Sequence, residues 1–178
     1  TSLDACVGLD GFLYDPHLIF SGKNIQRQMV PKGEKMKDSV ISVTEKGYQI
    51  GATLLATLQH WDKQLIARGV PKPVLWMTDG HASRLSLAVH KWCRSAEWIM
   101  NLSPPHTTGI HQPLDQIFKN WHKTFNGLVN TWCTDNIGRK IDKSMFARLF
   151  ARAWPLWTHP DTIVGAFCHC GVSIDGIN

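Results

Sequence analysis

The sequence predicts an α/β domain in which a mixed sheet is flanked by helices, and two observations predict it. Near the N-terminus, two short apolar segments stand on either side of an Asp10-Gly11 turn, which is typical of a hairpin. Farther along, short apolar runs alternate with longer segments whose apolar residues recur at helical spacing. A hairpin followed by alternating strands and helices favours a mixed sheet with helices packed against it.

The strands are expected where apolar residues form short runs that end at turn residues. They are residues 1–9, 17–20, 40–43, 74–77 and 98–100. The run 74–77 is almost continuously apolar, so we expect a central strand that is covered on both faces.

The helices are expected where apolar residues recur every three or four positions. The first runs from Ile50 to Ile66 and ends before Gly69. A second follows the fourth strand, with Leu85, Ala88, Val89 and Trp92 on its inner stripe. A long helix then carries apolar residues from 117 to 132, and two more are expected around 143–154 and 160–170.

The composition favours one globular domain over residues 1–178. The chain is 43% hydrophobic, has eight Trp residues, and is long enough to bury a sizeable core. It contains no run of eighteen apolar residues, so no membrane span is expected. Five Cys residues without a repeating framework favour a reduced intracellular compartment. The absence of an initial Met predicts that the chain is part of something longer.

The formal net charge of +5 suits a polyanionic partner, and the positive charge is unevenly spread. One stretch concentrates five basic residues, opposed only by two acids: Lys23, Arg27, Lys32, Lys35 and Lys37. This stretch is either a solvated loop or a surface that contacts nucleic-acid phosphates.

Two acidic residues, Asp79 and Asp115, are the candidate site. Asp79 follows the apolar strand 74–77, and Asp115 stands two residues after Pro113, where a helix is expected to begin. Alone, each has an ordinary structural explanation, because Asp-Gly after a strand is usually a turn and an acid in a first helical turn is favoured by the helix dipole. Together, two carboxylates from a strand end and a helix start can hold Mg²⁺ or Mn²⁺ for phosphoryl transfer.

The segments around these two acids resemble a known family. Residues 75–83 (LWMTDGHAS) resemble the second-acid motif of the DDE superfamily endonucleases, in particular the pogo/mariner-like transposases. Residues 103–108 (SPPHTT) with 112–115 (QPLD) resemble the third-acid motif, which is the more specific of the two. Weaker similarity at 16–23 and 165–171 extends the resemblance over essentially the whole chain.

The resemblance implies an RNase H-like fold and three carboxylates around two divalent metal ions, Mg²⁺ or Mn²⁺. Asp79 and Asp115 would be the second and third acids, and the first would lie on a strand that precedes Thr1. The domain is therefore expected to be N-terminally truncated, with an open seam beside the strand that leads to Asp79. Asp4 and Asp10 are the only acids near the expected position, and each is a weak substitute.

The implied activity is cleavage and strand transfer on DNA, with transposon ends or target DNA as the partner. A homodimer is a candidate assembly, and the expected location is the nucleus in a eukaryote and otherwise intracellular. His81 and His106 match family positions and are either accessory site residues or structural ones.

The sequence also departs from the family pattern, because Ser83-Arg84 stands where Ser-His is usual and Thr108-Gly109 where Thr-Thr-His is usual. Three functions stay open: an active DDE endonuclease, a transposase-derived nucleic-acid-binding protein without catalysis, and a non-functional fragment of a decayed element.

Overall fold

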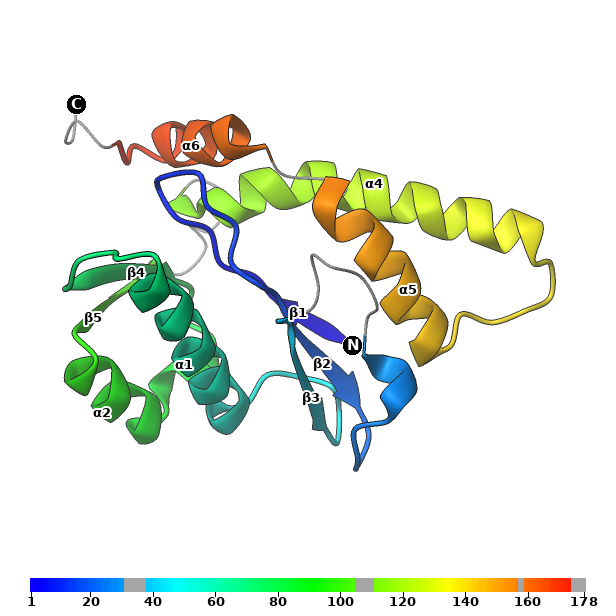
Figure 1. Cartoon of the computed structure of the whole chain (residues 1–178), viewed down its shortest axis with the longest axis horizontal. Helices are drawn as coiled ribbons and strands as arrows, with labels where there is room; N and C mark the ends of the chain where they lie inside the picture. The colour runs from blue at the N-terminus through cyan, green and yellow to red at the C-terminus, as the bar shows by residue number, and fades with distance from the viewer. Residues whose placement is uncertain (31–37, 105–110, 157–158, 174–178) are drawn as a thin grey trace.

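The chain forms a layered α/β structure with two small sheets between two groups of helices (Figure 1). The computed structural model describes residues 1–30, 38–104, 111–156 and 159–173. The predicted helices and strands are present, although the strand expected over residues 1–9 is limited to Ser2–Asp4 and the predicted mixed sheet is divided into two. None of the described helices has the length and apolar character needed to cross a membrane.

The first sheet contains β1 (Ser2–Asp4), β2 (His17–Ser21) and β3 (Val40–Thr44), with β2 in the middle. β1 runs antiparallel to β2, and β3 runs parallel to it. Four of the five residues of β2 are buried, as expected of the central strand of a covered sheet.

The second sheet contains β4 (Val74–Thr78) and β5 (Trp98–Leu102), which are parallel. They are connected by a short 3₁₀ turn, η3 (Ala82–Leu85), and by helix α2 (Leu87–Ser95). This strand–helix–strand unit places the residues that follow β4 and β5 at the same edge of the sheet.

Two groups of helices cover opposite faces of the sheets (Figure 1). On one face, α1 (Gly51–Ala67) packs with α2. On the other lie α4 (Pro113–Asp135), α5 (Lys143–Ala153) and α6 (Pro160–His169). Two further 3₁₀ turns, η1 (Arg27–Met29) and η4 (Trp154–Leu156), flank α5.

Each group of helices buries its own hydrophobic cluster. The cluster under α4, α5 and α6 is built on β2, whose Leu18 and Phe20 are fully buried there. The cluster under α1 and α2 is built on the second sheet, where Trp76 and Trp98 meet edge to face with ring centroids 6.1 Å apart. Most of the tryptophans therefore pack in the core, as the helical spacing predicts.

Two packing predictions are wrong. β4 is not covered on both faces, because Leu75 is 60% exposed and stands opposite the equally uncovered Ile99 of β5. Helices α4, α5 and α6 pack mainly over the first sheet, so Leu75 and Ile99 stay uncovered, although Met77 on the same face of β4 packs partly against their cluster. Leu85 and Ala88 also point outward, and Val89 with Cys93 forms the buried side of α2.

The two sheets are separated by a cavity of about 560 Å³. All of β4 lines one side of the cavity, and Leu3, Asp4 and the residues that follow β1 line the other. Within the described part of the chain, no strand ladder joins β1 to β4. The position of this groove corresponds to the seam that the sequence predicts beside the strand leading to Asp79.

Candidate functional site

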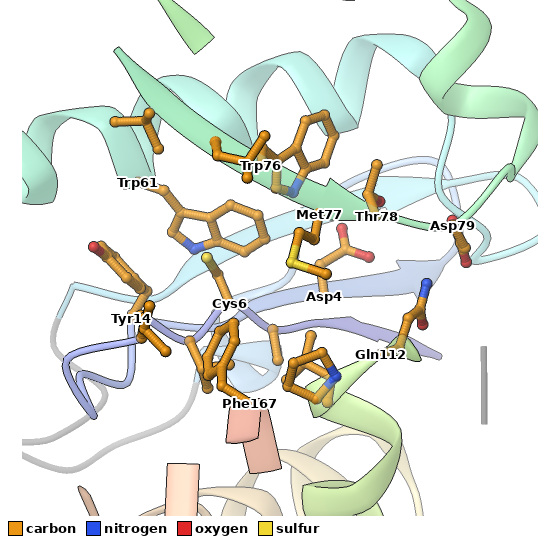
Figure 2. Close-up of a pocket in the computed structure, with 18 of the residues that line it drawn as sticks. Asp4, Cys6, Tyr14, Trp61, Trp76, Met77, Thr78, Asp79, Gln112 and Phe167 are labelled. Carbon is orange, nitrogen blue, oxygen red and sulfur yellow. The ribbon is translucent and has the colours of Figure 1, made fainter. Parts of the chain in front are cut away.

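The groove between the sheets is apolar along most of its length and polar at one end. Trp61, Trp76 and Cys6 line the apolar part, whereas Asp79 and Gln112 lie together at the other end (Figure 2). β4 and the N-terminal segment run in opposite directions along its two sides. The carboxylates are thus placed where the end of β4 meets the start of α4.

Asp79 directly follows β4 and lines the cavity. Its Oδ1 atom accepts a hydrogen bond from the backbone N–H of His81 at 3.2 Å, which closes the turn after the strand. The same oxygen lies 3.1 Å from Nε of Arg84 in an ion pair. The side chain of Asp79 is 41% exposed, so a ligand can still reach it.

Asp115 lies in the first turn of α4 and lines the same cavity. Pro113 occupies the first turn as predicted, and the backbone N–H of Asp115 donates to the carbonyl of Gln112 at 3.1 Å. Burial and the negative charge of Asp115 both raise the pKa of Cys170. Because it lies in the first turn of α4, Asp115 stands where the N–H groups at the start of a helix favour an anion. The structure thus places both predicted acids in the lining of one cavity.

A chain of polar contacts runs behind the two acids and connects the sheets. Gln49 precedes α1 and is almost completely buried. Its side-chain carbonyl accepts hydrogen bonds from Ser83 at 2.7 Å and from Arg84, and its amide donates to Asp4 of β1. Asp4 also lies 3.2 Å from Nδ1 of the fully buried His17 of β2. Arg84 and Gln49 thus span the polar end of the groove.

The two histidines have different outcomes. His81 is the N-cap of η3: its Nδ1 accepts the backbone N–H of Ser83 at 3.3 Å and lies 2.9 Å from the hydroxyl oxygen of that residue. Nδ1 of His81 therefore caps the turn, and an accessory role for this residue stays a prediction. His106 lies outside the described residues.

The predicted basic stretch is described only in part. Lys23 and Arg27 are exposed, and Lys32, Lys35 and Lys37 lie outside the described residues. Arg27 borders a shallow surface pocket of about 520 Å³ between η1 and α5, together with Gln26, Gln28, Val30, Ser144 and Arg148. No lining residue of this pocket carries a negative charge. Arg148 could not be selected from the sequence, because 120 residues lie between it and Arg27 and only the fold brings the two together.

Sequence reasoning also missed Gln49 and the role of Arg84. Arg84 does stand out in the sequence, since it replaces the usual histidine, but its partner Gln49 comes from a distant segment. No motif in the sequence marks Gln49. The helix that follows it is recognised only from the spacing of its apolar residues. Asp4 was a weak substitute for the first acid, and the structure does place it on the groove.

The described donors do not by themselves make a metal centre. Asp79 and Asp115 supply the hard oxygen ligands that Mg²⁺ and Mn²⁺ prefer. However, residues 1–30, 38–104, 111–156 and 159–173 contain no group of three or more His, Cys, Asp or Glu side chains that could hold one ion. The guanidinium of Arg84 also occupies one oxygen of Asp79.

Asp79 lies at the end of β4 and Asp115 in the first turn of α4, and both line one cavity beside the C-terminal edge of the second sheet, where α/β folds commonly bind ligands. The comparison with known families is specific: the model of the DDE superfamily endonucleases matches residues 1–167. The chain belongs to this family, whose members generally use divalent metals. The family expectation is confirmed at this level, and the pogo/mariner-like assignment stays a prediction.

One curated relative is a protein of Cochliobolus lunatus named "MFS-type transporter clz9". It is 26% identical to this chain over 105 residues, which are 59% of this chain and 11% of that protein. The chain therefore corresponds to a small part of that relative. No solved structure matches the chain.

Proposed function

We propose that this domain is the catalytic domain of a transposase-type DDE endonuclease, which cleaves phosphodiester bonds in DNA and transfers strands in a divalent-metal-dependent reaction. Asp79 and Asp115 are its metal-binding acids. The observation that carries the proposal is their convergence on one cavity, although they belong to different elements.

The proposal includes an additional strand in the groove between β1 and β4. Both sheet edges border the groove, and backbone N–H and C=O groups at such edges favour pairing with an extended segment. A strand there would join the two sheets into the single mixed sheet of an RNase H-like domain. It would also pass beside Asp79, where a further carboxylate could complete the ligand set.

When bound, Mg²⁺ or Mn²⁺ would supply Lewis-acid activation of the phosphate and of the attacking oxygen. The residues of this chain have simpler tasks. The turn after β4 fixes Asp79 through the N–H of His81, and the first turn of α4 fixes Asp115. Holding both acids on rigid elements preorganises the negative charge before a substrate arrives.

Plasmid nicking tests this proposal. We would compare the protein with a form that carries a designed N-terminal strand ending in an aspartate, each with Mn²⁺ and supercoiled plasmid. We expect Mn²⁺-dependent nicking by the extended form, and its loss by at least about a hundredfold in Asp79→Asn and Asp115→Asn, because charge-stabilising groups contribute on this scale. Asp135→Asn, an exposed acid at the far end of α4, is the matched control. Wild-type nicking by either site variant would refute the assignment.

A second candidate function is a transposase-derived DNA-binding protein without catalysis. The ion pair between Arg84 and Asp79 favours it, because the carboxylate already has a cationic partner. Under this alternative the extended form binds DNA but nicks no faster than its Asp79→Asn variant.

Both candidates require a surface that contacts DNA, and we propose the pocket that contains Arg27 and Arg148. Each arginine that neutralises a phosphate contributes about 0.9 to the slope of log affinity against log salt. The double variant Arg27→Gln/Arg148→Gln is therefore expected to bind duplex DNA more weakly, with a slope lower by about 2, in fluorescence anisotropy. Arg94→Gln on α2, in the opposite layer, is the control. An unchanged slope in the double variant would exclude this surface.

The finer features of the family assignment are part of the same proposal. They are a pogo/mariner-like origin, a homodimeric assembly on transposon ends or target DNA, and a nuclear location in a eukaryotic source.

A further inference from the structure

Hydrogen bonds to uncharged neighbouring side chains hold Arg84 in place at the candidate site. Its Nη1 donates to the hydroxyl of Ser83 at 2.8 Å and to the side-chain carbonyl of Gln49, and its Nε donates to the hydroxyl of Thr78 at 3.1 Å. Its side chain is only 16% exposed. Because three uncharged oxygens bind the guanidinium, its place does not depend on Asp79 alone.

The anchors of Arg84 are themselves held in place. Gln49 is oriented by Ser83 and by Asp4, so its carbonyl oxygen is aimed at the guanidinium. Thr78 is the last residue of β4 and is buried. A cation on such supports is a permanent part of the site, in contrast to a surface ion pair whose side chains move freely.

Arg84 contacts Asp79 at Oδ1, the oxygen that also closes the turn after β4. Oδ1 lies 3.1 Å from Nε of Arg84 in an ion pair and accepts a hydrogen bond from the N–H of His81 at 3.2 Å. Among the described residues, no contact of Oδ2 is found. A divalent ion therefore either binds Oδ2 alone, with a guanidinium next to it, or displaces Arg84 from Oδ1.

We propose that Arg84 is an internal counter-ion of Asp79 that opposes the binding of a divalent cation at this carboxylate. Two physical effects act in the same direction. The guanidinium neutralises the carboxylate charge that attracts the metal, and it repels a doubly charged ion a few ångströms away. The inference rests on the proposed function in one respect, since it takes Asp79 to be a metal-binding acid.

Mn²⁺ binding by the protein as it stands tests this inference without any assay of activity. Free Mn²⁺ is measured by electron paramagnetic resonance during a titration. Arg84→Gln removes the charge and keeps an amide that can still bond Gln49, so we expect its Mn²⁺ affinity to exceed that of the wild type by about tenfold or more. Arg84→Lys keeps the charge and is expected to stay within about threefold of the wild type. Arg68→Gln, which removes the arginine paired with Asp10, is the control and is expected to change nothing.

A double variant then locates the effect. In Arg84→Gln/Asp79→Asn the gain in affinity is expected to disappear, because the released carboxylate is its source. The inference is overturned if folded Arg84→Gln binds Mn²⁺ no more tightly than the wild type, or if the gain survives without Asp79. Should Arg84→Gln fail to fold, Asp79→Asn alone decides: a change within about threefold supports a carboxylate that is already neutralised, and a loss beyond tenfold overturns it.

The same titration separates this inference from the proposed function. Arg84→Gln/Asp115→Asn shows whether the second acid shares the ion. If the gain in Mn²⁺ affinity depends on Asp79 but not on Asp115, Arg84 is still the counter-ion of Asp79, but the two acids do not share a metal ion. A gain that needs both acids supports both statements.

Discussion

Gln49 is expected to be worth more to stability than its single side chain suggests, because it connects the two halves of the protein. It accepts hydrogen bonds from Ser83 and Arg84, which follow β4, and donates one to Asp4 in β1. Gln49→Ala removes all three. Two of them involve charged groups, at about 1.5–3 kcal/mol each, and the third is neutral, at about 0.5–1.5 kcal/mol.

The expected loss is smaller than this sum, because the partners keep other contacts and water can enter from the adjoining groove. Asp4 retains His17, and Arg84 retains Thr78. We expect the free energy of unfolding to fall by about 2–4 kcal/mol, which lowers Tm by about 4–16 °C for a domain of this size. Urea unfolding followed by tryptophan fluorescence measures the change.

Gln59→Ala is the matched control, since Gln59 is an exposed glutamine on the neighbouring helix α1. It should change the free energy of unfolding by no more than about 0.5 kcal/mol. If Gln49→Ala matched this control, the bridging role assigned to Gln49 would be refuted.

Three further predictions concern the core, the groove and pH. Leu18→Ala is expected to lower the free energy of unfolding, measured in urea, by about 2–5 kcal/mol, and Leu75→Ala by less than about 1 kcal/mol, because only Leu18 is buried. Equal losses would contradict the observed burial of Leu18 and exposure of Leu75. Burial raises the pKa of the Cys6 thiol to about 12, so at pH 8 it should react with a disulfide reagent at least about a hundredfold more slowly than the exposed Cys133; similar rates would mean an open groove. Partial burial of Asp10 is the largest single influence and raises its pKa, but the hydrogen bonds from Arg68 and the backbone N–H of Phe12, together with the charge of Arg68, outweigh it and hold the pKa below its usual range. Asp10→Asn should therefore lose less than about 1 kcal/mol at pH 7, and its difference from the wild type should shrink as the pH falls below about 4; a difference that grew in acid would have the wrong sign.

The positions of the helices and strands could be predicted because the signals for them are local. Apolar spacing defines α1 and α4, and Pro113 marks where α4 begins. Which faces of each strand are buried could not be predicted in the same way. The run 74–77 is apolar enough for a buried strand, but whether Leu75 is covered depends on where α4, α5 and α6 pack.

The candidate site shows the same division. The two acids could be selected from their flanking motifs, and the placement of Asp115 in the first turn of α4 followed from Pro113. The support of Arg84 beside Asp79 could not be predicted, because Gln49 reaches Arg84 only after the segment before α1 folds against η3. A sequence motif identifies the two carboxylates, whereas the tertiary fold determines that the guanidinium of Arg84 lies beside one of them.

The division of the interior into two clusters has a consequence for how the protein unfolds. Leu18 and Phe20 belong to one cluster and Trp76 and Trp98 to the other, and the strands that carry them share no hydrogen bonds within the described ranges. Each cluster can thus open as a separate cooperative unit, with its own protection against amide hydrogen exchange. A segment that filled the cavity between them would couple the opening of the two clusters more tightly than the contacts of Gln49 alone.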